Sequence, residues 1–139
     1  MKLIGYQPSI ELALVVSEDS ELIDDIQQTF CICMAQTAVK VIGTGADIIQ
    51  VVKSLKPQLV ILDLDGGDGN HFSVLQALKG ASNTPVITTS YSRDESTLVK
   101  SLEYGSDGHV NKPIRQLELI AHVRAVMRRN NQRCYSDSG

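Results

Sequence analysis

The chain has 139 residues, of which 42% are hydrophobic and 21% are charged, and its formal net charge at pH 7 is −3. This length suits one domain with its own core, and the composition excludes a disordered chain and gives no bulk electrostatic reason to bind nucleic acid. No apolar run reaches the roughly 20 residues that cross a bilayer, and the first residues do not resemble a secretory signal. Three cysteines, an odd number, suit reduced thiols, so we expect a cytoplasmic protein with no membrane contact.

The first half of the chain predicts two strand-helix units. Residues 12–16 (LALVV) form a short apolar run typical of a strand, and apolar residues at helical spacing over 22–30 predict the helix after it. Residues 38–43 (AVKVIG) predict a second strand. The segment 46–55 (ADIIQVVKSL) has one apolar face and predicts a second helix, which Pro57 ends.

The second half repeats this plan three times. Strands are predicted at 59–62 (LVIL), 85–89 (PVITT) and 108–111 (GHVN). The helices between them are predicted over 71–78 and from about residue 92 to 103, and a last helix follows Pro113. Two helices have apolar residues that we expect to face the core: Leu98, Val99 and Leu102 in the fourth, and Leu119, Ile120, Val123, Val126 and Met127 in the last.

Five strands that alternate with five helices predict an α/β fold with a doubly wound, five-stranded parallel sheet, because nearly continuous apolar strands must be covered on both faces. Residues 1–129 are expected to form this domain. Residues 130–139 (NNQRCYSDSG) are polar and are expected to form a disordered tail or the start of a linker to an output domain.

Polar side chains follow four of the five predicted strands. They are Ser17, Glu18 and Asp19 after the first strand, Asp63 and Asp65 after the third, Ser90 and Tyr91 after the fourth, and Asn111, Lys112 and Pro113 after the fifth. The carboxyl ends of parallel strands meet at one edge of the sheet, where ligands bind in such folds. Carboxylates held so close repel one another unless a cation lies among them, and oxygen ligands of this kind suit Mg²⁺.

These residues and their order resemble the CheY-like receiver domains of two-component response regulators, over about residues 10–129. The matching features are the acid after LVV, the segment PQLVILDL before the acceptor, PVITTS ending in a hydroxyl residue, and KP after the fifth strand. The resemblance implies a flavodoxin-like sheet with strand order 2-1-3-4-5. It also implies a signalling switch rather than an enzyme.

The resemblance implies a role for each matching residue. Asp63 would be the phosphoacceptor, and Glu18, Asp63 and Asp65 would hold Mg²⁺. Ser90 and Lys112 would bind the phosphoryl group, and the Lys112–Pro113 bond would be cis. His109 stands where the family often has an aromatic residue that turns inward on phosphorylation. The implied partners are a sensor histidine kinase or a phosphotransfer protein, and a second copy bound through the fourth helix, fifth strand and last helix. DNA would be bound only through an output domain.

Several residues depart from the family pattern. Ser17 replaces the first of two metal-holding acids, and Tyr91 replaces a small residue beside the phosphoryl site. Gly67 and His71 replace a proline and a glycine in the loop after the acceptor. We therefore expect a domain that accepts phosphate slowly, or a receiver-like interaction domain that signals without phosphate. The segment DLDGGDGN also resembles the nucleophile motif of haloacid-dehalogenase-like phosphatases, but that family has the motif near its start.

Overall fold

The computed structural model describes the backbone of residues 9–66 and 70–138, and the side chains in these ranges as far as residue 131. In chain order the elements are β1 (Leu12–Val16), α1 (Ser20–Cys33), β2 (Ala38–Ile42), α2 (Ile48–Leu55), β3 (Leu59–Asp63), α3 (His71–Ala81), β4 (Val86–Ser90), α4 (Glu95–Glu103), β5 (Gly108–Asn111) and α5 (Gln116–Ser138). Every predicted strand and helix is therefore present. Gly67 lies outside the described residues.

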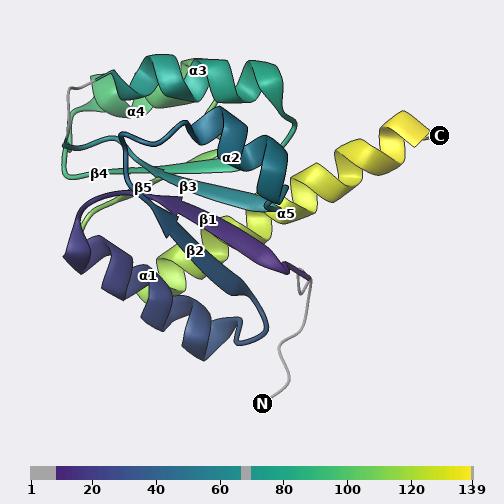
Figure 1. The fold of residues 1–139 in the computed structure, drawn as a ribbon, viewed down its shortest axis with the longest axis horizontal. Helices are drawn as coiled ribbons and strands as arrows, with labels where there is room; N and C mark the ends of the chain where they lie inside the picture. Colours follow the sequence, from purple (N-terminus) through teal and green to yellow (C-terminus); the bar gives the residue numbers. More distant parts are fainter. Residues whose placement is uncertain (1–8, 67–69, 139) are drawn as a thin grey trace.

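The five strands form one parallel sheet in the order β2-β1-β3-β4-β5 (Figure 1), which confirms the predicted fold class and strand order. The pairing register brings the strand ends together: Val16 pairs with Leu62, and Asp63 pairs with Thr89. Residues of β1, β3, β4 and β5 that leave the sheet at these ends therefore meet along one edge. This edge carries the predicted site.

Helices cover the sheet on both faces (Figure 1), with α1 and α5 on one side and α2, α3 and α4 on the other. Successive strand residues point to opposite faces, so Val15 and Ile61 pack with α1 and α5, whereas Val16 and Leu62 pack with α2 and α3. Burial on both faces explains why these strands read as continuous apolar runs. The predicted apolar stripe of α5 is also confirmed, because all five of its residues are buried.

Helix α4 does not face the core as predicted. Leu98, Val99 and Leu102 are 41%, 44% and 48% exposed, and the buried residue of α4 is Ser101. Residues turn by about 100° each around a helix, so Val99 lies roughly opposite Ser101 once Ser101 faces the sheet. The prediction assumed that the apolar side must be the inner one. In this domain α4 presents three large apolar side chains to the outside.

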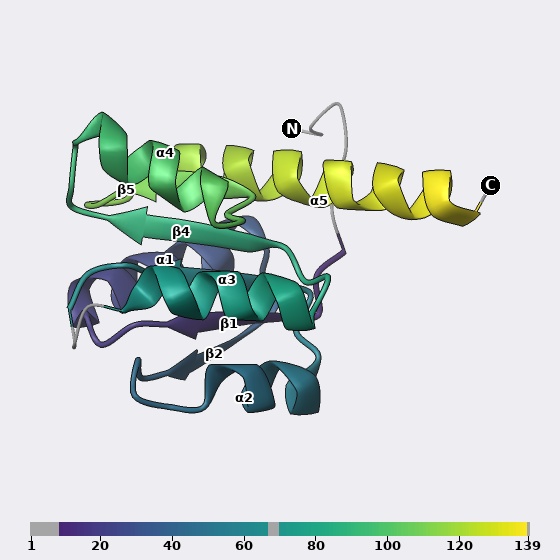
Figure 2. The same ribbon diagram turned by 90° about the horizontal axis from the view of Figure 1, so that it is seen from above.

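Helix α5 continues beyond the predicted end of the domain. It runs without interruption from Gln116 to Ser138, and its last turns project past the sheet (Figure 2), over residues for which the sequence predicted a polar tail or the start of a linker. The segment 116–138 contains neither proline nor glycine, so no residue in it breaks the helix. The boundary at residue 129 stays a prediction.

Two further observations bear on the sequence-based expectations. Within the described ranges, no helix combines the length and the apolar character needed to span a membrane. Cys31 and Cys33 are free thiols, and the side chain of Cys134 lies outside the described part of the chain.

Candidate functional site

Four chain segments meet at the carboxyl edge of the sheet. Asp63 is the last residue of β3, and its burial leaves it 2% exposed. Ser17 follows β1 directly and is also 2% exposed, and Lys112 follows β5. Ser90 is the last residue of β4 and is 2% exposed. The sheet therefore brings together three of the residues that the sequence predicted for the site, Asp63, Ser90 and Lys112, and the substituted position Ser17.

The ammonium group of Lys112 lies at the centre of this edge. Its Nζ is 3.0 Å from Asp63 Oδ1, 3.1 Å from Asp63 Oδ2, 2.9 Å from Asp19 Oδ2 and 3.1 Å from Asp65 Oδ2. The Lys112 side chain is 1% exposed, so water does not solvate the charge. A buried ammonium is tolerated only when partners of opposite charge replace its hydration. Here the carboxylates of Asp19, Asp63 and Asp65 are those partners.

The charges of this cluster shift one another's pKa values. Burial alone would lower the pKa of Lys112, but hydrogen bonds to Asp19 and Asp63 and the negative charge of Asp63 outweigh it and raise that pKa above its ordinary value. The hydrogen bond from Lys112 lowers the pKa of Asp19. Burial opposes ionisation of Asp65, but the Tyr91 N–H and Lys112 lower its pKa overall. Lys112, Asp19 and Asp65 are therefore charged near neutral pH.

Hydroxyl and amide groups also donate to the carboxylates of Asp63 and Asp65. Ser17 Oγ donates to Asp63 Oδ2 over 2.7 Å, and the Asp65 N–H donates to Asp63 Oδ1 over 3.1 Å. Ser90 Oγ donates to Asp65 Oδ1 over 3.0 Å, and the Tyr91 N–H donates to Asp65 Oδ2 over 2.8 Å. Asp65 therefore connects β3 to the end of β4. Both Asp63 oxygens are already in use.

Tyr91 covers the ammonium from outside. The Nζ of Lys112 lies 4.4 Å from the centre of the Tyr91 ring, which is a cation–π contact. Partial loss of hydration and the negative charges of Asp19 and Glu21 raise the pKa of the Tyr91 phenol. Tyr91 is 49% exposed, whereas the Lys112 side chain beneath its ring is 1% exposed. The ring therefore lies between Lys112 and the solvent. That Tyr91 crowds the phosphoryl site stays a prediction.

Glu18 does not contact this cluster. Its Oε2 accepts a hydrogen bond of 2.7 Å from Thr44 Oγ1, in the loop after β2. The acid beside Lys112 is instead Asp19, which sequence analysis placed at the strand end but gave no role. Asp19 also begins α1 as its N-cap and accepts from the N–H groups of Glu21 and Leu22. An acidic residue at the first position before a predicted helix was the available signal for this placement.

The side chains as placed do not form the predicted magnesium site. Mg²⁺ requires near-octahedral oxygen ligands at about 2.0–2.1 Å. Glu18 is bound to Thr44, Ser17 supplies no carboxylate, and Asp63 is paired with Lys112. In the part of the chain that the structure describes, no group of three or more His, Cys, Asp or Glu residues is arranged to hold a metal ion. The ammonium of Lys112 takes the central place among the carboxylates.

His109, the predicted switch residue, lies on β5 beside the pocket. Its Nδ1 is 2.8 Å from Thr88 Oγ1, and its Nε2 is buried without a hydrogen-bond partner among the described residues. Burial lowers the pKa of His109, and nearby His122 lowers it further, while Asp65 acts in the opposite direction. The ring is therefore neutral at pH 7. Its role as a switch stays a prediction.

Two other predictions concern the loops around the site. The Lys112–Pro113 peptide bond is cis, as the resemblance implied. His71 opens α3 and its Nε2 lies 2.5 Å from the carbonyl oxygen of Gly66. At position 71, where the family has a glycine, the imidazole of His71 therefore holds the chain directly after Asp65.

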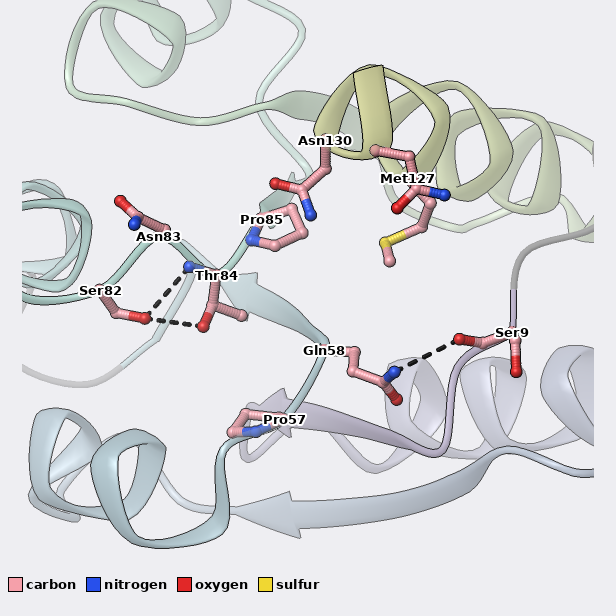
Figure 3. A pocket seen from close by; sticks show the side chains of 10 residues that line it. Ser9, Pro57, Gln58, Ser82, Asn83, Thr84, Pro85, Met127 and Asn130 are labelled. Carbon is pink, nitrogen blue, oxygen red and sulfur yellow. Dashed lines mark hydrogen bonds between the residues drawn. The ribbon is translucent and has the colours of Figure 1, made fainter. Parts of the chain in front are cut away.

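A cavity lies at the opposite edge of the sheet (Figure 3). Its volume is about 550 Å³, and it is formed by residues before β3 and β4 and by α5, among them Gln58, Asn83 and Asn130. Its described lining consists of amides, hydroxyls, prolines and Met127, with no charged side chain. This lining therefore has neither the carboxylates nor the ammonium that meet at the carboxyl edge of the sheet.

Comparison with known proteins establishes the family. A family profile described as the response regulator receiver domain matches residues 13–124. The chain belongs to the response regulator receiver domains. The DNA-binding response regulator MtrA of Mycolicibacterium paratuberculosis is 34% identical over 118 residues, which cover 85% of this chain and 52% of MtrA. The transcriptional regulatory protein KdpE of Mycobacterium tuberculosis is 33% identical over 119 residues, which cover 86% of this chain and 52% of KdpE. This receiver domain thus spans about half the length of these relatives.

Solved structures show the same fold. A CheY-like receiver domain protein from Methanospirillum hungatei superposes with a TM-score of 0.76 at 16% identity, covering 90% of this chain and 99% of that chain. The signal receiver domain of a DNA binding response regulator from Colwellia psychrerythraea gives a TM-score of 0.76 at 19% identity, covering 85% and 98%. At these identities the likeness concerns the fold alone.

Proposed function

We propose that this receiver domain accepts a phosphoryl group on Asp63 from a sensor histidine kinase or a phosphotransfer protein in the cytoplasm. The observation that supports this most is the contact of Lys112 Nζ with both oxygens of Asp63, at 3.0 and 3.1 Å. A carboxylate at a strand end with a fixed ammonium beside it has a nucleophile and a charge partner for the transferred oxygens. The domain is then a switch and not an enzyme with its own substrate.

The transfer requires changes in the pocket. An oxygen of Asp63 attacks the phosphorus of a phosphohistidine in line, and the phosphorus–nitrogen bond breaks. Because Lys112 contacts both Asp63 oxygens and Ser17 donates to Oδ2, these contacts must rearrange before either oxygen can attack. Tyr91 must also move, since its ring covers Lys112 and Asp63 is 2% exposed. Mg²⁺, the cofactor expected from the sequence, has no role in this proposal because the residues present do not assemble its ligands.

The outer face of α4, β5 and α5 is the proposed output surface. Ser90 can leave Asp65 for the new phosphoryl oxygens, and the neighbouring Thr88 holds His109 on β5. Movement at the end of β4 therefore reaches the surface beside α4. The exposed apolar residues there, Leu98, Val99 and Leu102, are suited to contact a second copy through the α4-β5-α5 face. MtrA is by name a DNA-binding response regulator. In the present protein, binding to DNA would come from an output domain.

Phosphate incorporation tests the acceptor. The wild type, Asp63→Asn and the control Asp65→Asn are incubated with acetyl phosphate, with and without Mg²⁺, and analysed by intact-protein mass spectrometry. We expect the added mass of one phosphoryl group on the wild type and on Asp65→Asn. Asp63→Asn should stay unmodified because it lacks the nucleophile. A phosphorylated Asp63→Asn variant would place the acceptor elsewhere.

A second function is favoured by the closed state of the pocket. Lys112 is 1% exposed and saturates Asp63, and Tyr91 covers it, an arrangement that also suits an interaction domain that signals without phosphate. In that case Asp63 and Lys112 are a structural ion pair. The same incubation distinguishes the two functions: a wild type that stays unmodified while its self-association equals that of Asp63→Asn supports the second.

A further inference from the structure

We propose that Lys112 is the resident cation of the acidic pocket, held in place by Asp19 and Tyr91, and that the domain in this arrangement neither needs nor tightly binds Mg²⁺. The proposal rests on the proposed function only in placing the site around Asp63. It concerns metal and stability, not phosphate. The two can therefore fail separately.

The first support is the position of the charge. Lys112 Nζ lies within 3.1 Å of carboxylate oxygens of Asp19, Asp63 and Asp65, as a bound metal would lie among its ligands. A Mg²⁺ ion placed there would meet the ammonium as a like charge at short range. Binding therefore requires Lys112 to leave first. Its departure would also break three ion pairs.

The second support is the replacement of one acid by another. Ser17 lacks a carboxylate, and its hydroxyl donates to Asp63. Asp19, two residues later, supplies a carboxylate that points at Lys112 over 2.9 Å instead. At this strand end the carboxylate nearest to Lys112 therefore anchors the lysine, and position 17 supplies no carboxylate for a metal. The segment SED after β1 thus favours the ammonium of Lys112 over a bound Mg²⁺ ion as the cation of the pocket.

The third support is the cover over the ammonium. The ring of Tyr91 lies 4.4 Å from Nζ, on the side that opens to solvent. The small residue expected at this position would leave that side open. The ring stabilises the ammonium by a cation–π contact and keeps water from replacing the carboxylates. Tyr91 and Asp19 are therefore positioning residues, which act through Lys112.

Magnesium binding tests the role of Tyr91. Amide chemical shifts are followed by NMR during a MgCl₂ titration of the wild type, Tyr91→Ala, Tyr91→Phe and the control Tyr104→Ala. Tyr104 also lies near a lysine, with its ring centre 5.9 Å from Lys100 Nζ, but outside the pocket. We expect Tyr91→Ala to bind at least about tenfold more tightly than the wild type, the size of one cation–π contact of about 1.4 kcal/mol. Tyr91→Phe keeps the ring and should behave as the wild type does, as should Tyr104→Ala.

A second experiment tests Lys112 directly. Urea unfolding of the wild type and of Lys112→Met is measured with and without Mg²⁺. Without Lys112 the carboxylates repel, so Mg²⁺ should raise the unfolding midpoint of Lys112→Met and leave that of the wild type unchanged. A Lys112→Met chain that folds only with Mg²⁺ supports the proposal equally. It is overturned by sub-millimolar Mg²⁺ binding to the wild type, by equal affinities of the wild type and Tyr91→Ala, or by a Lys112→Met midpoint that does not respond.

Discussion

Restoring the missing acid at residue 17 should make the stability of the domain depend on magnesium. Ser17 is 2% exposed, and its Oγ lies 2.7 Å from Asp63 Oδ2. Ser17→Asp removes a hydrogen bond to a charged group, which is worth about 1.5–3 kcal/mol. It also places a second carboxylate against Asp63, and two like charges about 4 Å apart repel by roughly 4 kcal/mol at an effective dielectric of about 20. Lys112 offsets part of that repulsion. We expect a loss of about 3–5 kcal/mol in the free energy of unfolding without Mg²⁺, the range found when buried ion pairs are broken.

Mg²⁺ should restore much of the free energy of unfolding that Ser17→Asp loses, because the new carboxylate is the ligand that the receiver pattern normally provides. A ligand at about 100 times its dissociation constant stabilises the folded state by about 2.7 kcal/mol. The assay is urea unfolding at pH 7 of the wild type, Ser17→Asp and Ser17→Ala, each with and without Mg²⁺. Ser17→Ala loses the same hydrogen bond without adding a charge, so it should be destabilised less and should not respond to the metal. If Ser17→Asp is no less stable than Ser17→Ala without Mg²⁺, or is not stabilised by it, the electrostatic reasoning is refuted.

Three further predictions concern charge and surface. The lowered pKa of His109 means that its neutral form stabilises the fold above its ordinary pKa of 6.5, and that this contribution is lost as the pH falls through the pKa of the folded state. Urea unfolding at about pH 7.5 and 5.5 should show a larger loss for the wild type than for His109→Gln; equal losses would contradict this. The lowered pKa of Asp19 means that its ion pair contributes above the ordinary value of 3.8 and not below the folded-state value. Asp19→Asn should therefore cost about 1 kcal/mol at pH 7 and nothing near pH 2. Asp47→Asn, at another helix N-cap for which the described residues provide no lysine partner, should cost little at either pH. On the surface, Leu102→Asp should abolish self-association in analytical ultracentrifugation, and Ile32→Asp, on α1, should not; dimers of Leu102→Asp would exclude the α4-β5-α5 face.

The fold was predictable because its strands carry a strong signal. Each central strand is buried on both faces, so residues such as Val60 and Ile61 must both be apolar, and a short apolar run results. The orientation of α4 was not predictable from periodicity alone. Its apolar residues could face the sheet or a partner, and only packing against β5 decides that Ser101 is the inner residue. The end of α5 was not predictable either, because a polar segment without a helix breaker is compatible with a helix or with a tail.

The residues of the site were likewise predictable only in part. Asp63, Ser90 and Lys112 were predictable because a parallel sheet forces the ends of its strands to meet. The choice between Glu18 and Asp19 was not, because both lie in the short segment between β1 and α1 and differ only in how the chain turns into α1. That turn makes Asp19 the N-cap and directs one of its oxygens to the helix N–H groups and the other to Lys112. Glu18, one residue earlier, points towards the loop after β2.

The same contacts that stabilise the resting pocket oppose its activation. Lys112 is the group best placed to stabilise a transferred phosphoryl group, yet it is also the group that occupies both oxygens of the acceptor. An interaction made in the ground state and lost on the way to the transition state raises the barrier, because catalysis depends on the difference between the two. Asp19 and Tyr91 strengthen the ground state, since each holds Lys112 where it blocks Asp63. Loosening either residue should therefore speed the modification of Asp63 while it lowers the stability of the unmodified domain, so rate and stability should change in opposite directions across these variants.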